Sequence, residues 1–110
     1  MHVKVKTIGS FIERLGFKER EVDFQGNTVE DLMRFLKGTL GTTFEENVLE
    51  PNGKVKPFIK VLVNGLGIET LRGLSTELND GDVVAIFPPV GGGSLRFSRI
   101  FTASTAILIF

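Results

Sequence analysis

An apolar segment that ends in two prolines and leads into a glycine-rich stretch is the feature that most restricts this chain. Residues 83–87 are β-branched, small or aromatic, a composition that predicts a buried strand. Pro88 and Pro89 cannot donate a backbone hydrogen bond, so pairing within a sheet is expected to stop there. Residues 91–93 are all glycine and have no Cβ. The pattern predicts a rigid strand that carries a thin segment, narrow enough to enter an enzyme tunnel.

Periodicity elsewhere predicts an α+β domain around this strand. One long helix is expected at about residues 28–37, opening with a capping box of Thr28 and Asp31 and ending at Gly38. Further strands are expected from residue 2 to 7 or 8, over 21–25 and over 58–63, with short helices at 10–15 and 44–49. The first two strands should pair antiparallel, because a short connection joins them.

The expected strand at 58–63 has apolar residues on both faces, with Phe58 and Leu62 opposite Ile59. This pattern is typical of a central strand. The segments Asn64-Gly65 and Asp80-Gly81-Asp82 are predicted to be turns, and the aspartates turn formers instead of catalytic carboxylates.

Composition excludes several classes of function. Thirteen basic residues balance thirteen acidic ones, which argues against a nucleic-acid partner bound through a basic face. Without cysteine there is no disulfide, thiolate metal site or thiol nucleophile, and with His2 as the one histidine no metal site is expected. The N-terminus does not have the pattern of a signal peptide, and the most apolar window, residues 100–110, is shorter than the roughly 20 residues that span a bilayer. No membrane partner is expected.

Several stretches resemble a known family. They are residues 8–16 (IGSFIERLG), 28–32 (TVEDL), 61–65 (VLVNG) and 78–93 (LNDGDVVAIFPPVGGG). Together they resemble the MoaD/ThiS family of ubiquitin-like sulfur carriers, and in particular the small subunit of molybdopterin synthase. The resemblance covers residues 1–93 and implies a β-grasp fold, a mixed sheet of four to five strands crossed by one main helix. Residues 94–110 are then a C-terminal extension of strand character.

The resemblance also implies a chemistry. An ATP-dependent enzyme of the ubiquitin-activating type adenylates the carboxylate of the last glycine, Gly93, which Gly92 precedes. Sulfur transfer then gives a thiocarboxylate, which donates its sulfur to a pterin precursor in the large molybdopterin synthase subunit. The chain is thus expected to be a cytoplasmic, non-catalytic carrier subunit that needs no cofactor of its own.

The resemblance places the docking surface around the base of the glycine segment. By position, Ile8, Leu71 and Phe87 are the apolar residues expected to be exposed to both partners. The segment Pro88-Pro89-Val90-Gly91 completes the expected partner-binding set, with Gly91 as a spacer.

The chain departs from the family because residues 94–110 follow Gly93, whose carboxylate is therefore held in a peptide bond. One interpretation is a precursor that a processing protease cuts after Gly93. A second is a structural extension, which adds strands to its own sheet or joins two copies in a homodimer. A third is an artefact of the gene or its expression.

Two other functions share the fold. The chain could be a ubiquitin-like protein modifier that is conjugated to lysines through its glycine. It could also be a non-conjugating β-grasp binding module.

Overall fold

The computed structural model of the chain describes residues 1–89, and positions 90–110, including the predicted C-terminal extension, lie outside the described residues. In the described part, one sheet in the order β2-β1-β5-β3-β4 is formed by β1 His2–Thr7, β2 Glu19–Asp23, β3 Lys60–Val63, β4 Leu66–Gly67 and β5 Val83–Phe87. The helices are α1 Phe11–Leu15, α2 Val29–Leu40 and α3 Thr42–Val48, with the short 3-10 turns η1 Ile68–Thr70 and η2 Gly73–Ser75.

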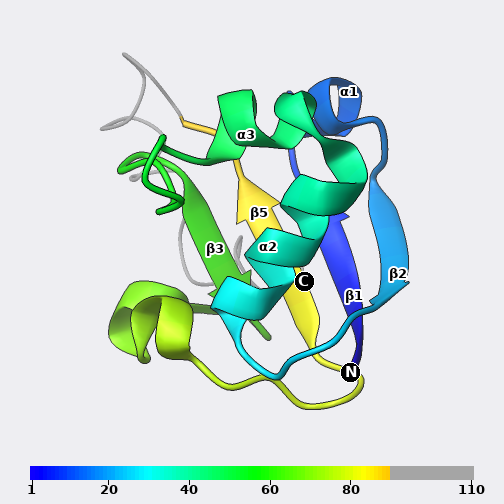
Figure 1. Ribbon diagram of the computed structural model, residues 1–110, viewed down its shortest axis with the longest axis vertical. Helices are drawn as coiled ribbons and strands as arrows, with labels where there is room; N and C mark the ends of the chain where they lie inside the picture. The colour runs from blue at the N-terminus through cyan, green and yellow to red at the C-terminus, as the bar shows by residue number, and fades with distance from the viewer. Residues whose placement is uncertain (90–110) are drawn as a thin grey trace.

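The first and last of these strands, β1 and β5, lie side by side and run parallel in the middle of the sheet (Figure 1). β1 also pairs antiparallel with β2, as expected, and β5 pairs antiparallel with β3. Parallel neighbours need a crossover connection, and α2 crosses the sheet within it. This topology confirms the β-grasp fold predicted from the sequence.

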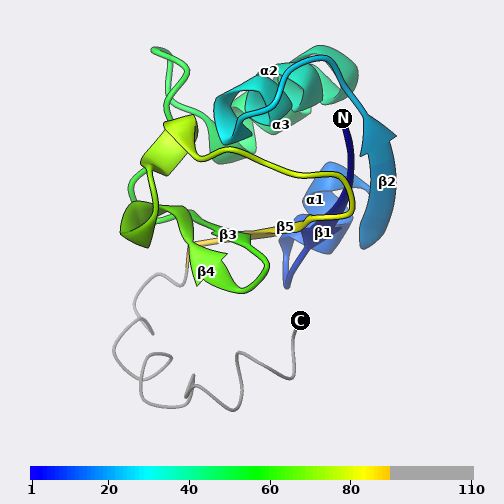
Figure 2. The ribbon, with the colours of Figure 1, turned by 90° about the horizontal axis from the view of Figure 1, so that it is seen from below.

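The three α-helices lie on one side of the sheet (Figure 2). The core forms between these layers, from alternate residues of the strands and the apolar stripe of each helix. Its fully buried side chains include Val3, Val5, Val61, Val84 and Ile86 from the sheet and Phe11, Leu32, Phe44 and Val48 from the helices. At about 25 cal/mol per Å² of buried apolar surface, this interface is the main source of stability.

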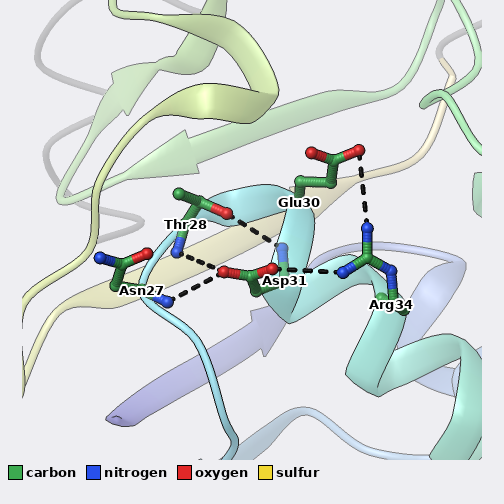
Figure 3. Close-up of polar contacts among 5 residues, drawn as sticks. All are labelled: Asn27, Thr28, Glu30, Asp31 and Arg34. Atoms are coloured by element: carbon green, nitrogen blue, oxygen red, sulfur yellow. Dashed lines mark hydrogen bonds and ion pairs between the residues drawn. The ribbon is translucent and has the colours of Figure 1, made fainter.

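The capping box predicted for α2 is confirmed (Figure 3). The Thr28 hydroxyl accepts a hydrogen bond from the Asp31 amide at 3.2 Å. The Asp31 carboxylate accepts from the amides of Asn27 at 3.0 Å and Thr28 at 3.2 Å. These donors, the Asn27 amide foremost, hold the pKa of Asp31 below its ordinary value. These two side chains thus accept hydrogen bonds from backbone amides at the helix start, which have no acceptor within the helix.

α2 runs beyond its predicted end. Gly38 was expected to terminate the helix, but the helix continues to Leu40, and Gly41 with φ 67° ends it. Gly38 does not have positive φ, whereas Gly41 does. Leu40 is partly buried against the core, and this contact favours one further turn.

Two strands also differ from their predicted bounds. β2 occupies 19–23 instead of 21–25, and the Phe24 amide bonds to the carbonyl of Met1 at 3.0 Å just beyond it. β3 begins at Lys60, because the Ile59 amide bonds back to the carbonyl of Lys56 at 3.1 Å and makes residues 57–58 a turn. The prediction of Phe58 within a central strand was therefore wrong.

Candidate functional site at the end of strand β5

The end of β5 lies between two other segments of the sheet. On one side Thr7 of β1 is level with Ile86, and on the other Lys60 of β3 is level with Phe87. The chain leaves the sheet at Pro88, between the residues that follow β1 and those that precede β3. The base of the glycine segment is therefore surrounded by residues 8–9 and 58–60.

β5 is a rigid support for whatever follows it. Strands pair with it on both edges, and Val84, Ala85 and Ile86 have no exposed surface. Buried central strands open only with the whole fold, so their ends are held firmly in place. The position at which the chain emerges from Phe87 is thus set by the sheet.

Gly9 lies against the first proline. Its φ is +60°, and a Cβ at this position would be 3.5 Å from Cγ of Pro88. The carbonyls of Ile8 and Gly9 accept hydrogen bonds from Phe11 at 3.2 Å and Ile12 at 3.1 Å, so the start of α1 holds this loop. Gly9 was not among the predicted site residues, although a glycine between a predicted strand and a predicted helix is a signal for such a close approach.

Phe58 lies on the other side of the emerging chain. The paired register ends at Lys60 and Phe87, and Phe58 lies two residues before Lys60 in the turn that precedes β3. Its side chain is 78% exposed, the largest value among the exposed large hydrophobics of the described residues. Pro57, which is disfavoured inside a sheet, is the sequence signal that could have indicated a later strand start.

The predicted docking residues do not all lie here. Ile8 is partly buried and adjoins Gly9 beside the end of β5. Leu71 is 40% exposed but follows η1, which lies near the opposite end of β3 (Figure 1). Val90 and Gly91, and with them Gly92 and Gly93, lie outside the described residues.

Phe87 is at the site, but its expected exposure was wrong, because only 6% of its surface is accessible. Phe87 and Ala85 alternate along β5 with the core residues Val84 and Ile86, so both point to the face away from the α-helices. Both are buried but stand outside the main core cluster. The sheet therefore carries a separate apolar strip on its second face.

Ion pairs border this strip. Lys4 and Lys6 lie 3.5 and 3.7 Å from the carboxylate of Glu19, and Lys60 lies 3.2 Å from that of Glu69. A backbone hydrogen bond at Glu69 itself, followed by the contact with Lys60, lowers the pKa of this carboxyl. The pairs are solvent-accessible and contribute little stability, but they give the strip a charged border.

Asp80 and Asp82 act in turns at the opposite end of β5. Asp80 accepts a hydrogen bond from the His2 amide at 2.8 Å, and Asp82 accepts from Asn79 and Asn64 at 2.8 and 2.9 Å. Within residues 1–89, no group of three carboxylates or histidines could hold a metal ion. No helix in the same part of the chain is long and apolar enough to cross a membrane.

The profile of the ThiS family matches residues 5–93, a span that includes β5 and ends at the last glycine. The chain belongs to the ThiS family. A ThiS-family protein with this β-grasp fold is a ubiquitin-like protein of the sulfur-carrier and small-modifier class.

Individual relatives extend the family assignment. A candidate sulfur carrier protein of Archaeoglobus fulgidus is 38% identical over 73 residues, which are 66% of this chain and 82% of that protein. Small archaeal modifier protein 3 of Haloferax volcanii is 37% identical over 99 residues, 84% of this chain and 100% of that one. Among solved structures, a candidate molybdopterin converting factor, subunit 1, from Pyrococcus furiosus has a TM-score of 0.64 and 32% identity, covering 82% of this chain and 99% of that one.

Proposed function

We propose that this chain carries sulfur on the carboxylate of Gly93 for molybdopterin synthesis, after cleavage of the bond between Gly93 and Ser94. The observation that carries the proposal is the placement of Pro88 and Pro89 at the end of a central strand, four residues before the glycine at which the family match ends. In this proposal residues 1–93 are the functional domain and 94–110 an extension that a protease removes.

The proposed chemistry takes place at the Gly93 carboxylate, which an adenylating enzyme has to reach at the end of a short tail. Water, used by the protease, frees the Gly93 carboxylate. A carboxylate oxygen then attacks the α-phosphorus of ATP, and pyrophosphate leaves. Hydrosulfide then attacks the acyl carbon of the adenylate, AMP departs, and the carbon is left as a thiocarboxylate. The need for ATP fits a cytoplasmic protein.

In this proposal the residues of the chain position the Gly93 carboxyl group for the adenylating enzyme, and they take no part in acid–base chemistry. Four residues beyond Pro89 reach at most about 14 Å, so an adenylating enzyme must bring its active site close to the end of β5. Two prolines limit the backbone freedom that is lost when the tail enters that site. Gly92 and Gly93 add no side chain that could clash with a narrow entrance.

The pterin acceptor is proposed on two grounds. The Phe87-Pro88-Pro89-Val90 segment resembles the molybdopterin branch of the family, and the Pyrococcus furiosus protein of similar structure is a candidate molybdopterin converting factor subunit. The large molybdopterin synthase subunit is then the second partner, after the adenylating enzyme.

The test is ATP–pyrophosphate exchange with the adenylating enzyme of the source organism. A chain ending at Gly93 should support exchange, whereas the full chain and a chain ending at Gly92 should not. All described helices, strands and core residues lie within residues 2–87, and 82% of this chain suffices to cover 99% of the Pyrococcus furiosus structure, so the shortened chain retains a complete fold. Absence of exchange with the Gly93 form would refute the proposal.

A second function is favoured by the match to small archaeal modifier protein 3 along its whole length. In that case the activated Gly93 carboxyl is joined to a lysine amine, and AMP or a thiol leaves. Mass spectrometry of tagged protein from its own cells distinguishes the two. A free C-terminal thiocarboxylate identifies the carrier, and branched peptides that end in Gly93 on lysine identify the modifier.

A further inference from the structure

Phe58 is a large apolar side chain that the fold does not use. It is 78% exposed, compared with 57% for Leu66 and 40% for Leu71. It belongs neither to the core cluster nor to the partly buried residues that pack against it. Exposed aromatic residues at a functional edge are typical anchors of protein interfaces.

The backbone holds Phe58 in a defined position. The Lys56 amide bonds to the carbonyl of Val48 at 2.9 Å, and the Ile59 amide bonds to the carbonyl of Lys56 at 3.1 Å. Ile59 is buried, 6% exposed, so the turn is fixed to the core immediately after Phe58. A side chain on such a turn loses little backbone freedom on binding.

The position of Phe58 also points to its partner. It lies two residues before Lys60, which pairs with the last residue of β5, and Gly9 approaches Pro88 from the β1 side. The tail to Gly93 spans at most about 14 Å, so any enzyme that reacts with Gly93 must cover the surface next to Pro89. A partner that does not react with Gly93 need not cover that surface.

Basic residues flank the aromatic ring in the sequence. Lys54 and Lys60 are exposed, and Lys56 is partly buried. Lys60 is paired with Glu69 at 3.2 Å, and the ammonium of Lys56 bonds to the carbonyl of Glu46. An apolar pocket with carboxylates at its rim would complement these ammonium groups, since opposite charges steer two surfaces into register.

We propose that Phe58 is an anchor residue for the adenylating enzyme that activates Gly93, seated in an apolar pocket with an acidic rim beside the tail entrance. The proposal rests on the proposed activation of Gly93. It adds a contact that is independent of the glycine segment and of Ile8, Leu71 and Phe87.

The test uses the chain ending at Gly93 in the ATP–pyrophosphate exchange assay, with carrier concentration varied. Phe58→Ala should raise the KM for the carrier by about 30-fold, the scale of an interface hot spot, and should leave kcat within about twofold. Phe58→Leu should restore part of the affinity. The control Leu66→Ala, an exposed hydrophobic on β4, should leave the KM within about twofold.

The outcomes separate the anchor from the function on which it rests. Absence of exchange with the unsubstituted chain that ends at Gly93 refutes the activation of Gly93. Normal exchange with an unchanged KM in Phe58→Ala overturns the anchor alone. A Phe58→Ala variant that loses self-association but keeps its KM assigns Phe58 to contacts between copies of the chain and also overturns the proposal. Equal melting temperatures for the parent and variant confirm that folding is not the cause of any difference.

Discussion

Single residues in this chain act mainly by satisfying backbone groups at the ends of elements. Asp31 accepts hydrogen bonds from two amides, and Thr28 satisfies the amide of Asp31 in return (Figure 3). Arg34 lies 3.3 Å from Asp31 and 3.8 Å from Glu30 on the exposed side of the same turn. The start of the main helix therefore depends on a few side chains whose contributions can be measured one at a time.

Thr28→Ala should lower the free energy of unfolding by about 1 kcal/mol, because it removes the acceptor for the Asp31 amide. Urea denaturation at neutral pH measures the change. Glu30→Ala, which removes only an exposed ion pair, is the control and should have a much smaller effect. Equal losses in both variants would contradict the capping account.

His2 should make stability depend on pH. Hydrogen bonds to Asp23 and then Glu21 raise its pKa above 6.5, so the folded state binds the proton more tightly than the unfolded state. The stabilisation is complete below pH 6.5 and disappears as the pH rises through the raised pKa. His2→Gln should lower the urea midpoint at about pH 5 and match the parent at about pH 9.

As His2 is the one histidine of the chain, its ring protons give an unambiguous NMR titration. Asp23→Asn removes the strongest contact and should lower the measured pKa. A parent pKa at or below 6.5 would contradict the prediction.

At the scale of elements, α2 shows how tertiary contacts set the length of a helix. The amphipathic pattern predicts its core-facing residues, and Val29, Leu32, Met33 and Leu36 are indeed buried. The end is decided by Leu40, which packs on the core and carries the helix across Gly38. Only Gly41, with φ 67° and ψ −145°, stops it, and the same residue begins α3.

Replacing these two glycines should therefore have opposite effects. Gly38→Ala should stabilise the chain by about 0.5–1 kcal/mol, since the helix interior is compatible with alanine and no atom lies within 4 Å of the added Cβ. Gly41→Ala meets no atom either, but its φ of +67° strains any side chain, so it should destabilise. Thermal and urea unfolding measure the change in stability of each variant. Destabilisation by Gly38→Ala would contradict the assigned helix end.

The molecule as a whole has one main core, shared by helices and sheet, with a smaller apolar strip on the opposite face. The main cluster joins residues from β1, β3 and β5 to those from the three α-helices. Elements that share one core are expected to unfold together. The end of β5 is thereby held by the stability of the entire fold.

Leu32→Ala tests this coupling, because Leu32 is fully buried between α2 and the sheet. It should lower the free energy of unfolding by about 2–5 kcal/mol. Hydrogen exchange should accelerate to the same extent in the amides of α2 and of β5. Leu66→Ala, at a side chain that is 57% exposed, should have little effect, and faster exchange confined to α2 would show that the layers unfold separately.

Much of the fold could be predicted from local patterns. The strand at 83–87, the Thr28–Asp31 cap, the Gly16 end of α1 and the Asn64-Gly65 turn all follow from residues adjacent in sequence. One error arose where a distant contact decides and the other where a local turn does. Gly38 was expected to end α2, and Phe58 was expected in a strand that begins after it.

The sequence by itself determined the type of each main element, the family and the order of a strand, two prolines and the glycines, because these depend on local propensity and on motifs of fixed spacing. Only the tertiary structure decided what surrounds the end of that strand. Pairing of β5 with β1 and β3 brings Gly9 to Pro88 and the turn at residues 57–58 to the end of β5, buries Phe87 and leaves Leu71 elsewhere. Such contacts join residues far apart in the chain, and periodicity contains no information about which strands become neighbours.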